Sequence, residues 1–186
     1  MIKQELEIVD MELKDAFIIR PKEFYDERGT FLKLYNREIL KSRNVEPFFA
    51  EDYISISKKG VIRGLHYQLD PFAQAKLVRC VRGEVFDVLV DLRKNSSTFG
   101  KWKSVILSEE NRLSVYVPRG FAHGFLSLVE DSIVSYKADN DYSTAHERTL
   151  LWNDKTLGIN WPKLDQYLLS KKDEVGMPFN VADKFE

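Results

Sequence analysis

Residues 84–93, EVFDVLVDLR, show the pattern on which the fold prediction depends. Successive side chains of a β-strand point to opposite faces, so every second residue shares a face. One face of this segment would carry Phe86, Val88, Val90 and Leu92, and the other would carry Val85, Asp87, Leu89 and Asp91. Apolar residues that recur with this period predict a β-strand.

The same period of two recurs along the chain. It is found in residues 16–21 (AFIIRP), 52–68 (DYISISKKGVIRGLHYQ), 102–108 (WKSVILS), 113–118 (LSVYVP), 123–128 (HGFLSL) and 132–138 (SIVSYKA). Gly, Asn, Ser and Pro gather between these runs, for example in RKNSSTFGK and VPRG, where they favour turns. Many short strands separated by turns indicate an all-β sandwich or barrel, of which the jelly roll is one form.

Helical signals are few. REILKSRN, residues 37–44, is the one good candidate, and the polar tail after Trp161 predicts a loop or a short helix. We therefore expect an all-β protein with a few short peripheral helices. The length of 186 residues and the lack of an internal boundary predict a single domain over residues 1–186.

Charge and cysteine content argue against several classes of protein. Lys and Arg total 28 against 29 Asp and Glu, so no global basic field exists and we expect no nucleic-acid partner. Cys80 is the only cysteine, which suits a reducing compartment, and its apolar surroundings indicate a buried side chain. No segment has the long apolar run of a membrane span or the apolar centre of a signal peptide. We expect a cytoplasmic protein that does not enter a membrane.

The stretch VIRGLHYQL, residues 61–69, contains the first of three histidines, His66. A histidine in a strand more often packs than reacts, so this residue alone indicates no function. Strand alternation places His66 and Arg63 on opposite faces, and both can reach one cavity only if the strand bends. Gly64 lies between them and is the residue type that permits a β-bulge.

A metal site is the alternative for these histidines. Small β-barrels of the cupin type often bind a metal through His-x-His, a downstream Glu and a later His that follows a Pro-x-Gly-x-x-His turn. The chain has that turn, ending at His123, but Gln68 stands where the second histidine would be and no carboxylate follows at the usual spacing. Two histidine ligands are too few for a tight transition-metal site, so we expect no metal.

Several longer motifs occur in a fixed order. They are FYDERGTF (24–31), VIRGLHYQ (61–68), AQAKLVRCVRGEVFDVLVDLRKNSSTFGKW (73–102), VPRGFAHGFLSL (117–128), SYKADNDYS (135–143), LLWNDKTLGINWP (150–162) and LSKKD (169–173). Together they resemble the dTDP-4-dehydrorhamnose 3,5-epimerase family over residues 16–173. The resemblance implies a cupin-type jelly roll (a double-stranded β-helix), a homodimer and an isomerase of deoxysugar and polysaccharide biosynthesis that uses no cofactor.

The resemblance also implies roles for four catalytic residues. The C4 ketone of a nucleotide-linked 4-keto-6-deoxy sugar acidifies the hydrogens at C3 and C5, so epimerisation needs a base on one face and an acid on the other. His66 matches the base, Asp173 the carboxylate that orients it, and Tyr136 the acid. Lys76 would stabilise the enolate oxygen. Without the resemblance, Tyr136 would be a core residue and Lys76 a solvated one.

Substrate-binding roles follow from the same motifs. His123 would donate a hydrogen bond to the sugar or the enolate, and Arg63 would pair with the diphosphate through its guanidinium. Arg28 would reach the nucleotide across a dimer interface. Further positions expected to bind substrate are Lys33, Glu51, Tyr53, Gln68, Glu147 and Lys172.

The chain departs from the family pattern on the nucleotide side. The family usually has Gln-Asp-Asn where this chain has Glu51-Asp52-Tyr53, and a glutamate where it has Lys33. Ala75 and Asp141 replace a glycine and a tyrosine. The default substrate is dTDP-4-dehydro-6-deoxy-glucose, but a GDP-, UDP- or CDP-linked 4-keto hexose or heptose stays open, as does inversion at C3 alone.

Other functions remain possible at this point. A sugar 3,4-ketoisomerase would move protons through a similar enediol on a jelly roll. A non-catalytic sugar-binding jelly roll would not need His66, Lys76 and Tyr136 together. A metal-dependent cupin oxygenase is the third alternative.

Overall fold

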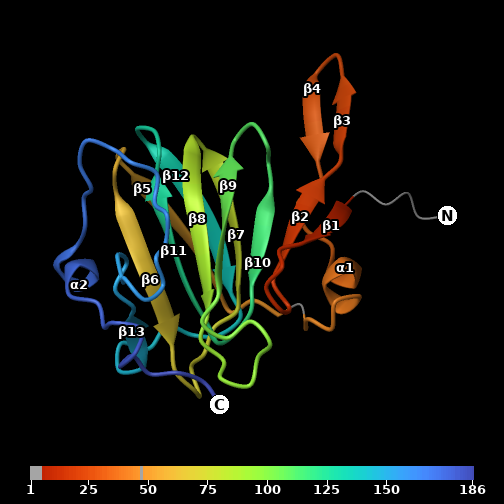
Figure 1. Ribbon diagram of the computed structural model, residues 1–186. Helices are drawn as coiled ribbons and strands as arrows, with labels where there is room; N and C mark the ends of the chain where they lie inside the picture. The colour runs from red at the N-terminus through yellow and green to blue at the C-terminus, as the bar shows by residue number, and fades with distance from the viewer. Residues whose placement is uncertain (1–5, 47) are drawn as a thin grey trace.

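The computed structural model describes residues 6–46 and 48–186. Figure 1 shows a sandwich of β-strands with a hairpin, β3 (Glu23–Asp26) and β4 (Gly29–Leu32), projecting from it. One sheet has the order β1 (Leu6–Asp10), β2 (Phe17–Pro21), β10 (Ser114–Val117), β7 (Lys76–Arg82), β12 (Ser132–Ala138) and β5 (Glu51–Ser57). The other has the order β13 (Glu147–Thr149), β6 (Ile62–Gln68), β11 (Phe121–Ser127), β8 (Glu84–Asp91) and β9 (Trp102–Ser108).

Every ladder in both sheets is antiparallel, and neighbours in a sheet are often distant in sequence. This non-consecutive order is expected of Greek-key connections, from which jelly rolls are built. The predicted all-β jelly roll is confirmed. The helices are short, as expected: α1 spans Arg37–Lys41 and α2 spans Lys171–Glu174.

Strand β8, which was predicted from the alternation in residues 84–93, is buried on both faces. Val85 and Leu89 lie in the core between the two sheets, together with Val78 and Val134 of the six-stranded sheet. The opposite face packs beneath the C-terminal part of the chain in a second cluster, with Val88, Val90, Leu92, Leu157 and Phe179. Because the sheet is covered on both sides, apolar residues predominate on both faces of β8, and Asp87 and Asp91 are buried among them.

The predicted bulge in β6 is confirmed. His123 of β11 pairs with His66, and Phe125 pairs with Arg63, so two residues of β6 lie opposite one of β11. Gly64 has φ +130° there, and a Cβ on it would come within 2.5 Å of the Gly124 Cα. Only glycine fits this close approach, which lets Arg63 and His66 line the same hollow.

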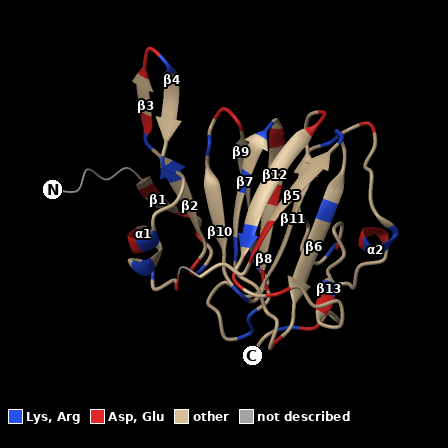
Figure 2. Cartoon of the chain, turned by 180° about the vertical axis from the view of Figure 1, so that it is seen from behind, with Lys and Arg blue, Asp and Glu red and all other residues tan. Residues whose placement is uncertain are grey.

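The hairpin of β3 and β4, which we call the arm, carries large exposed apolar side chains. Tyr25 is 72% exposed and Phe31 is 69% exposed. Figure 2 shows both signs of charge on the arm and on α1 and α2, which agrees with the near-neutral composition. Over the part of the chain that the structure describes, no helix is long and apolar enough to cross a membrane.

Candidate active site

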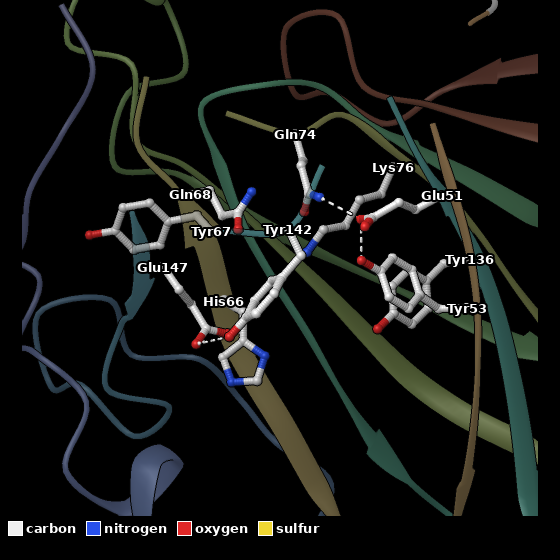
Figure 3. A pocket seen from close by; sticks show the side chains of 10 residues that line it. All are labelled: Glu51, Tyr53, His66, Tyr67, Gln68, Gln74, Lys76, Tyr136, Tyr142 and Glu147. Atoms are coloured by element: carbon white, nitrogen blue, oxygen red, sulfur yellow. Dashed lines mark hydrogen bonds between the residues drawn. The ribbon is translucent and has the colours of Figure 1, made fainter. Parts of the chain in front are cut away.

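A cavity of about 410 Å³ lies between the two sheets (Figure 3). β5, β7 and β12 line one side and β6 and β13 the other, and two residues come from loops, Gln74 and Tyr142. The full lining set is Glu51, Tyr53, His66, Tyr67, Gln68, Gln74, Lys76, Tyr136, Tyr142 and Glu147. A second hollow of about 370 Å³ shares His66, Lys76, Tyr136 and Glu147 with it. The two hollows therefore adjoin, and together they can hold a ligand larger than one sugar ring.

His66 enters this cavity from β6 and is held by Asp173. The His66 Nε2 lies 2.5 Å from the Asp173 Oδ1, although 107 residues separate the two in sequence. Ser170 caps α2, and its hydroxyl donates to the Asp173 Oδ2 at 2.8 Å. The carboxylate is thus fixed on both oxygens, and the Nδ1 of His66 is the nitrogen left for the cavity.

Burial decides the charge state of this pair. Desolvation lowers the pKa of His66 below its usual value, although the hydrogen bond and charge of Asp173 oppose this shift. Burial works against ionisation of Asp173, but the hydrogen bond and charge of His66 bring the Asp173 pKa below its usual range. A neutral imidazole beside a carboxylate is suited to accept a proton.

Tyr136 faces the cavity from the opposite sheet, on β12. Burial raises the pKa of its phenol, and the charge of Arg63 partly offsets that effect. The hydroxyl therefore keeps its proton at neutral pH and can donate it. A base from one sheet and a proton donor from the other can address opposite faces of a ring between them.

Lys76 begins β7, and its side chain points into the cavity rather than into solvent. Its Nζ lies 5.9 Å from the centre of the Tyr136 ring. Burial lowers the pKa of Lys76 to about 8, while the charges of Glu147 and Asp87 favour its protonated form. Near neutral pH it is a cation in a desolvated site, where it can stabilise a developing oxyanion.

His123 lies beside His66 on the neighbouring strand and lines the second hollow. Its Nε2 is 2.9 Å from the Asp87 Oδ2 and 3.1 Å from the Oδ1. Asp87 is fully buried, and burial raises its pKa against the opposing effects of His123 and Lys76. The site therefore holds two histidine–aspartate pairs.

Charged groups surround the cavity mouth. Arg63 donates from Nε to the Ser57 hydroxyl at 3.0 Å and from Nη2 to the Ile56 carbonyl at 3.3 Å, so its guanidinium is oriented. Lys172 donates to the Glu147 Oε1 at 2.7 Å, and the hydroxyl of Tyr142 donates to the Oε2 at 3.0 Å. Glu147 holds a cation and an aromatic ring at the mouth.

The side chain of Gln68 reaches the cavity but bonds mainly to backbone. Its Nε2 donates to the carbonyls of Phe72 at 2.7 Å and Asp141 at 3.1 Å, and its Oε1 accepts from the Ser143 amide at 2.6 Å. This glutamine anchors the loop that carries Tyr142. Contact with a ligand would use the one acceptor position that remains on its Oε1.

Arg28 and Lys33 lie outside this cavity. Arg28 is at the tip of the arm, where its side chain is 86% exposed and paired with Asp26. Lys33 directly follows β4 at the base of the arm. Within one chain neither lines the cavity, so contact with the substrate would need a second copy.

The described residues include no cluster of three His, Cys, Asp or Glu side chains that could hold a metal ion. The carboxylates near His66 and His123 instead bond to the imidazoles themselves.

A family model described as dTDP-4-dehydrorhamnose 3,5-epimerase matches residues 10–180. The chain belongs to this family. A dTDP-4-dehydrorhamnose 3,5-epimerase of Shigella flexneri is 50% identical over 97% of this chain and 99% of its own length.

Solved structures of relatives agree. The epimerase of Elizabethkingia anophelis has a TM-score of 0.92 at 46% identity, covering 95% of this chain and 97% of its own. A dTDP-6-deoxy-D-glucose 3,5-epimerase of Legionella pneumophila, solved with dTDP-4-keto-L-rhamnose, has a TM-score of 0.91 at 40% identity, covering 96% and 95%. The protein therefore has the fold of nucleotide-sugar epimerases of the cupin type.

Sequence reasoning missed some residues of this epimerase site. Asp87 was assigned only to a strand face, yet a carboxylate in the middle of an apolar strand signals a partner, which is His123. Ser170, which holds Asp173, gave no signal beyond a helix-capping position.

Proposed function

We propose that this protein epimerises a nucleotide-diphosphate 4-keto-6-deoxy sugar at C3 and C5, with dTDP-4-dehydro-6-deoxy-glucose as the substrate. The observation that carries the proposal is the placement of His66 and Tyr136 on opposing sheets around one cavity that also contains Lys76. The Legionella relative binds dTDP-4-keto-L-rhamnose, a sugar of this class.

The proposed reaction starts with proton removal. The Nδ1 of His66 takes the hydrogen from the carbon next to the C4 ketone, and the C–H electron pair moves to make an enolate whose charge lies on O4. Asp173 stabilises the resulting imidazolium. Lys76 stabilises the enolate oxygen, and His123 donates a hydrogen bond to the sugar or that oxygen.

Inversion then needs a proton on the opposite face. The hydroxyl of Tyr136 gives its proton to the carbon, and the O4 electron pair re-forms the ketone. His66 afterwards returns its proton to solvent and the phenolate of Tyr136 takes one up, so the cycle conserves atoms and charge. No group in this sequence changes oxidation state, and we propose that none needs a cofactor or a metal.

The nucleotide would lie toward the cavity mouth. We assign the diphosphate to Arg63 and Lys172, because the guanidinium is oriented and both are cations at the second hollow. Gln68 and Glu147 line the first hollow and would contact the base or ribose, while Glu51 and Tyr53 line the same hollow beside Tyr136. Because Glu51 and Tyr53 differ from the family pattern, a GDP-, UDP- or CDP-linked sugar is the second candidate substrate.

We further propose that the protein is a single epimerase domain over residues 1–186 that works in the cytoplasm as a homodimer. Ile54, Ile56 and Val81 expose between 48% and 67% of their surface on the outer face of the six-stranded sheet. This face and the arm are the surfaces through which two copies would join. Arg28 at the arm tip could then reach the partner's cavity. Sedimentation of the purified protein tests the dimer.

The experiment that tests the function is incubation with 4-keto sugar nucleotides in heavy water. We expect deuterium at C3 and C5 together with inverted product, and the greatest kcat/KM with the dTDP sugar. Exchange at C3 alone would indicate a one-centre epimerase, and a 3,4-ketoisomerase would move the ketone, which product NMR detects. Exchange at neither carbon would defeat the proposal.

A further inference from the structure

Tyr136 lies against a second tyrosine that the reaction above does not use. Tyr53 of β5 and Tyr136 of β12 are directly opposite in the antiparallel register. Their ring centres are 4.9 Å apart and the ring planes differ by 24°, which is a stacked arrangement. Figure 3 shows the two rings overlapping at the side of the cavity away from His66. Aromatic pairs of this kind add stability beyond their buried area.

The position of Tyr53 is in turn fixed by Glu51. Its hydroxyl donates to the Glu51 Oε2, two residues earlier on the same face of β5. The Gln74 Nε2 lies 3.5 Å from the same carboxylate oxygen and donates to the Asn140 carbonyl at 2.8 Å. Burial and the bond to Glu51 raise the pKa of Tyr53, so its phenol remains a donor throughout the neutral range.

Tyr136 lacks a comparable anchor. In the portion of the chain described by the structure, its hydroxyl makes no hydrogen bond, whereas those of Tyr53, Tyr67 and Tyr142 each have an acceptor. A free hydroxyl is what a proton donor needs, but it leaves the direction of the ring to packing alone. The ring packs against the inter-sheet core on one part of its surface and against Tyr53 on another.

We propose that Tyr53, held by Glu51, is a positioning residue that aims the hydroxyl of Tyr136 at the sugar carbon. This inference depends on the proposed roles of His66 and Tyr136. Glu51 and Tyr53, which depart from the family pattern, would then serve proton delivery instead of nucleotide recognition. Small errors in the placement of an acid have large effects on the transfer rate.

A misaimed Tyr136 should change the ratio in which the enolate is protonated with retention and with inversion. Once His66 has made the enolate, the carbon can regain a proton from His66 with retention or receive one from Tyr136 with inversion. If Tyr136 is poorly aimed, inversion slows while proton removal continues. In heavy water, deuterium would then enter unepimerised substrate faster relative to formation of inverted product.

The test compares initial rates of exchange and inversion, measured by NMR, for Tyr53→Leu, Tyr53→Phe and the wild type. Tyr53→Leu removes the stack, and we expect inversion to fall about tenfold with exchange falling less than about threefold. Tyr53→Phe keeps the ring but loses the Glu51 bond, and we expect an intermediate ratio. Tyr116→Leu, which removes a stack of the same spacing on Phe17 outside the cavity, is the matched control and should keep the wild-type ratio.

The outcomes separate this inference from the function that it depends on. A wild-type protein without exchange would defeat the proposed function itself. A wild-type protein that exchanges and inverts, with variants that lose both rates in equal proportion or lose neither, would overturn the role of Tyr53 alone. Binding of dTDP, measured by calorimetry, should change less than about threefold in Tyr53→Leu. A tenfold weaker Kd with an unchanged ratio would instead make Tyr53 a nucleotide contact and overturn the inference.

Discussion

The two histidine–aspartate pairs face one cavity but are built differently. His66 is paired with Asp173, which arrives on a short helix near the end of the chain. His123 is paired with Asp87, which lies on the adjacent strand of the same sheet. The side chain of His66 is 25% exposed, against 8% for His123.

The difference in exposure between His66 and His123 indicates which pair can transfer protons. A base must release its proton to solvent in every cycle, so an imidazole open to the cavity suits that task. A pair enclosed within a sheet holds one ring orientation and exchanges poorly with water, so it suits a fixed hydrogen-bond donor. The chemistry of the two pairs is the same, and burial assigns their roles.

The largest effect should come from the histidines themselves. We expect His66→Asn to lower the rate of deuterium exchange at C3 about a thousandfold, because the base is lost. His123→Asn should lower it only about tenfold, because a hydrogen-bond donor is weakened. NMR in heavy water measures both. Equal losses, or a greater loss in His123→Asn, would reverse the assignment of the two pairs.

The second-largest effect is the loss of kcat that we expect on replacing Asp173. Asp173→Asn keeps a hydrogen-bond acceptor for the His66 Nε2 but removes the charge that stabilises the imidazolium. We expect kcat to fall about a hundredfold with little change in KM. Steady-state kinetics with the dTDP sugar measures this. A rise in KM at constant kcat would place Asp173 in substrate binding and would not fit its contact with His66.

Asp87 should matter more for stability than Asp173 and less for turnover. Asp87→Asn weakens a charged hydrogen bond in the core, so we expect the free energy of unfolding to fall by about 2 kcal/mol. We expect kcat to fall only about tenfold, since His123 stays in place. Urea unfolding and kinetics on the same preparation test both parts. A hundredfold loss of kcat at unchanged stability would make this pair the reactive one.

The two pairs also show which contacts could be predicted from the sequence and which could not. Alternation along residues 84–93 predicted β8, and Gly64 predicted the bulge that carries His66, because both depend on local backbone geometry. The meeting of Asp173 with His66 came from family resemblance alone, since no local pattern links residues 107 apart.

Contacts that depend on strand order and register could not be predicted from the sequence. The stacking of Tyr53 on Tyr136 requires β5 and β12 to be neighbours in one sheet, and the chain between them contains six other strands. Asp87 carried a local signal, because an isolated carboxylate on an apolar strand must find a partner when it is buried. Its partner, His123, became visible only in the folded sheet.

The smallest effect is the dependence of activity on pH, which involves Lys76 and the open pair of His66 and Asp173. Burial lowers the pKa of His66, so the base is neutral above that pKa and becomes protonated, hence inactive, as the pH falls through it. Lys76 has a pKa of about 8, so the cation near the enolate is lost as the pH rises past 8. We expect kcat/KM to form a bell, falling about eightfold between pH 7.5 and pH 9 as Lys76 loses its proton.

Two variants test which group causes the acid side and which causes the alkaline side of the pH profile of kcat/KM. Lys76→Arg keeps a positive charge at every accessible pH, so the alkaline limb should flatten even if the maximum is lower. His123→Asn should keep the acid limb, because that limb reports the open pair and not the buried one. An alkaline limb that persists in Lys76→Arg would mean that another group, such as Tyr136, sets it. Loss of the acid limb in His123→Asn would mean that the buried pair titrates during turnover, against the division of roles that burial implies.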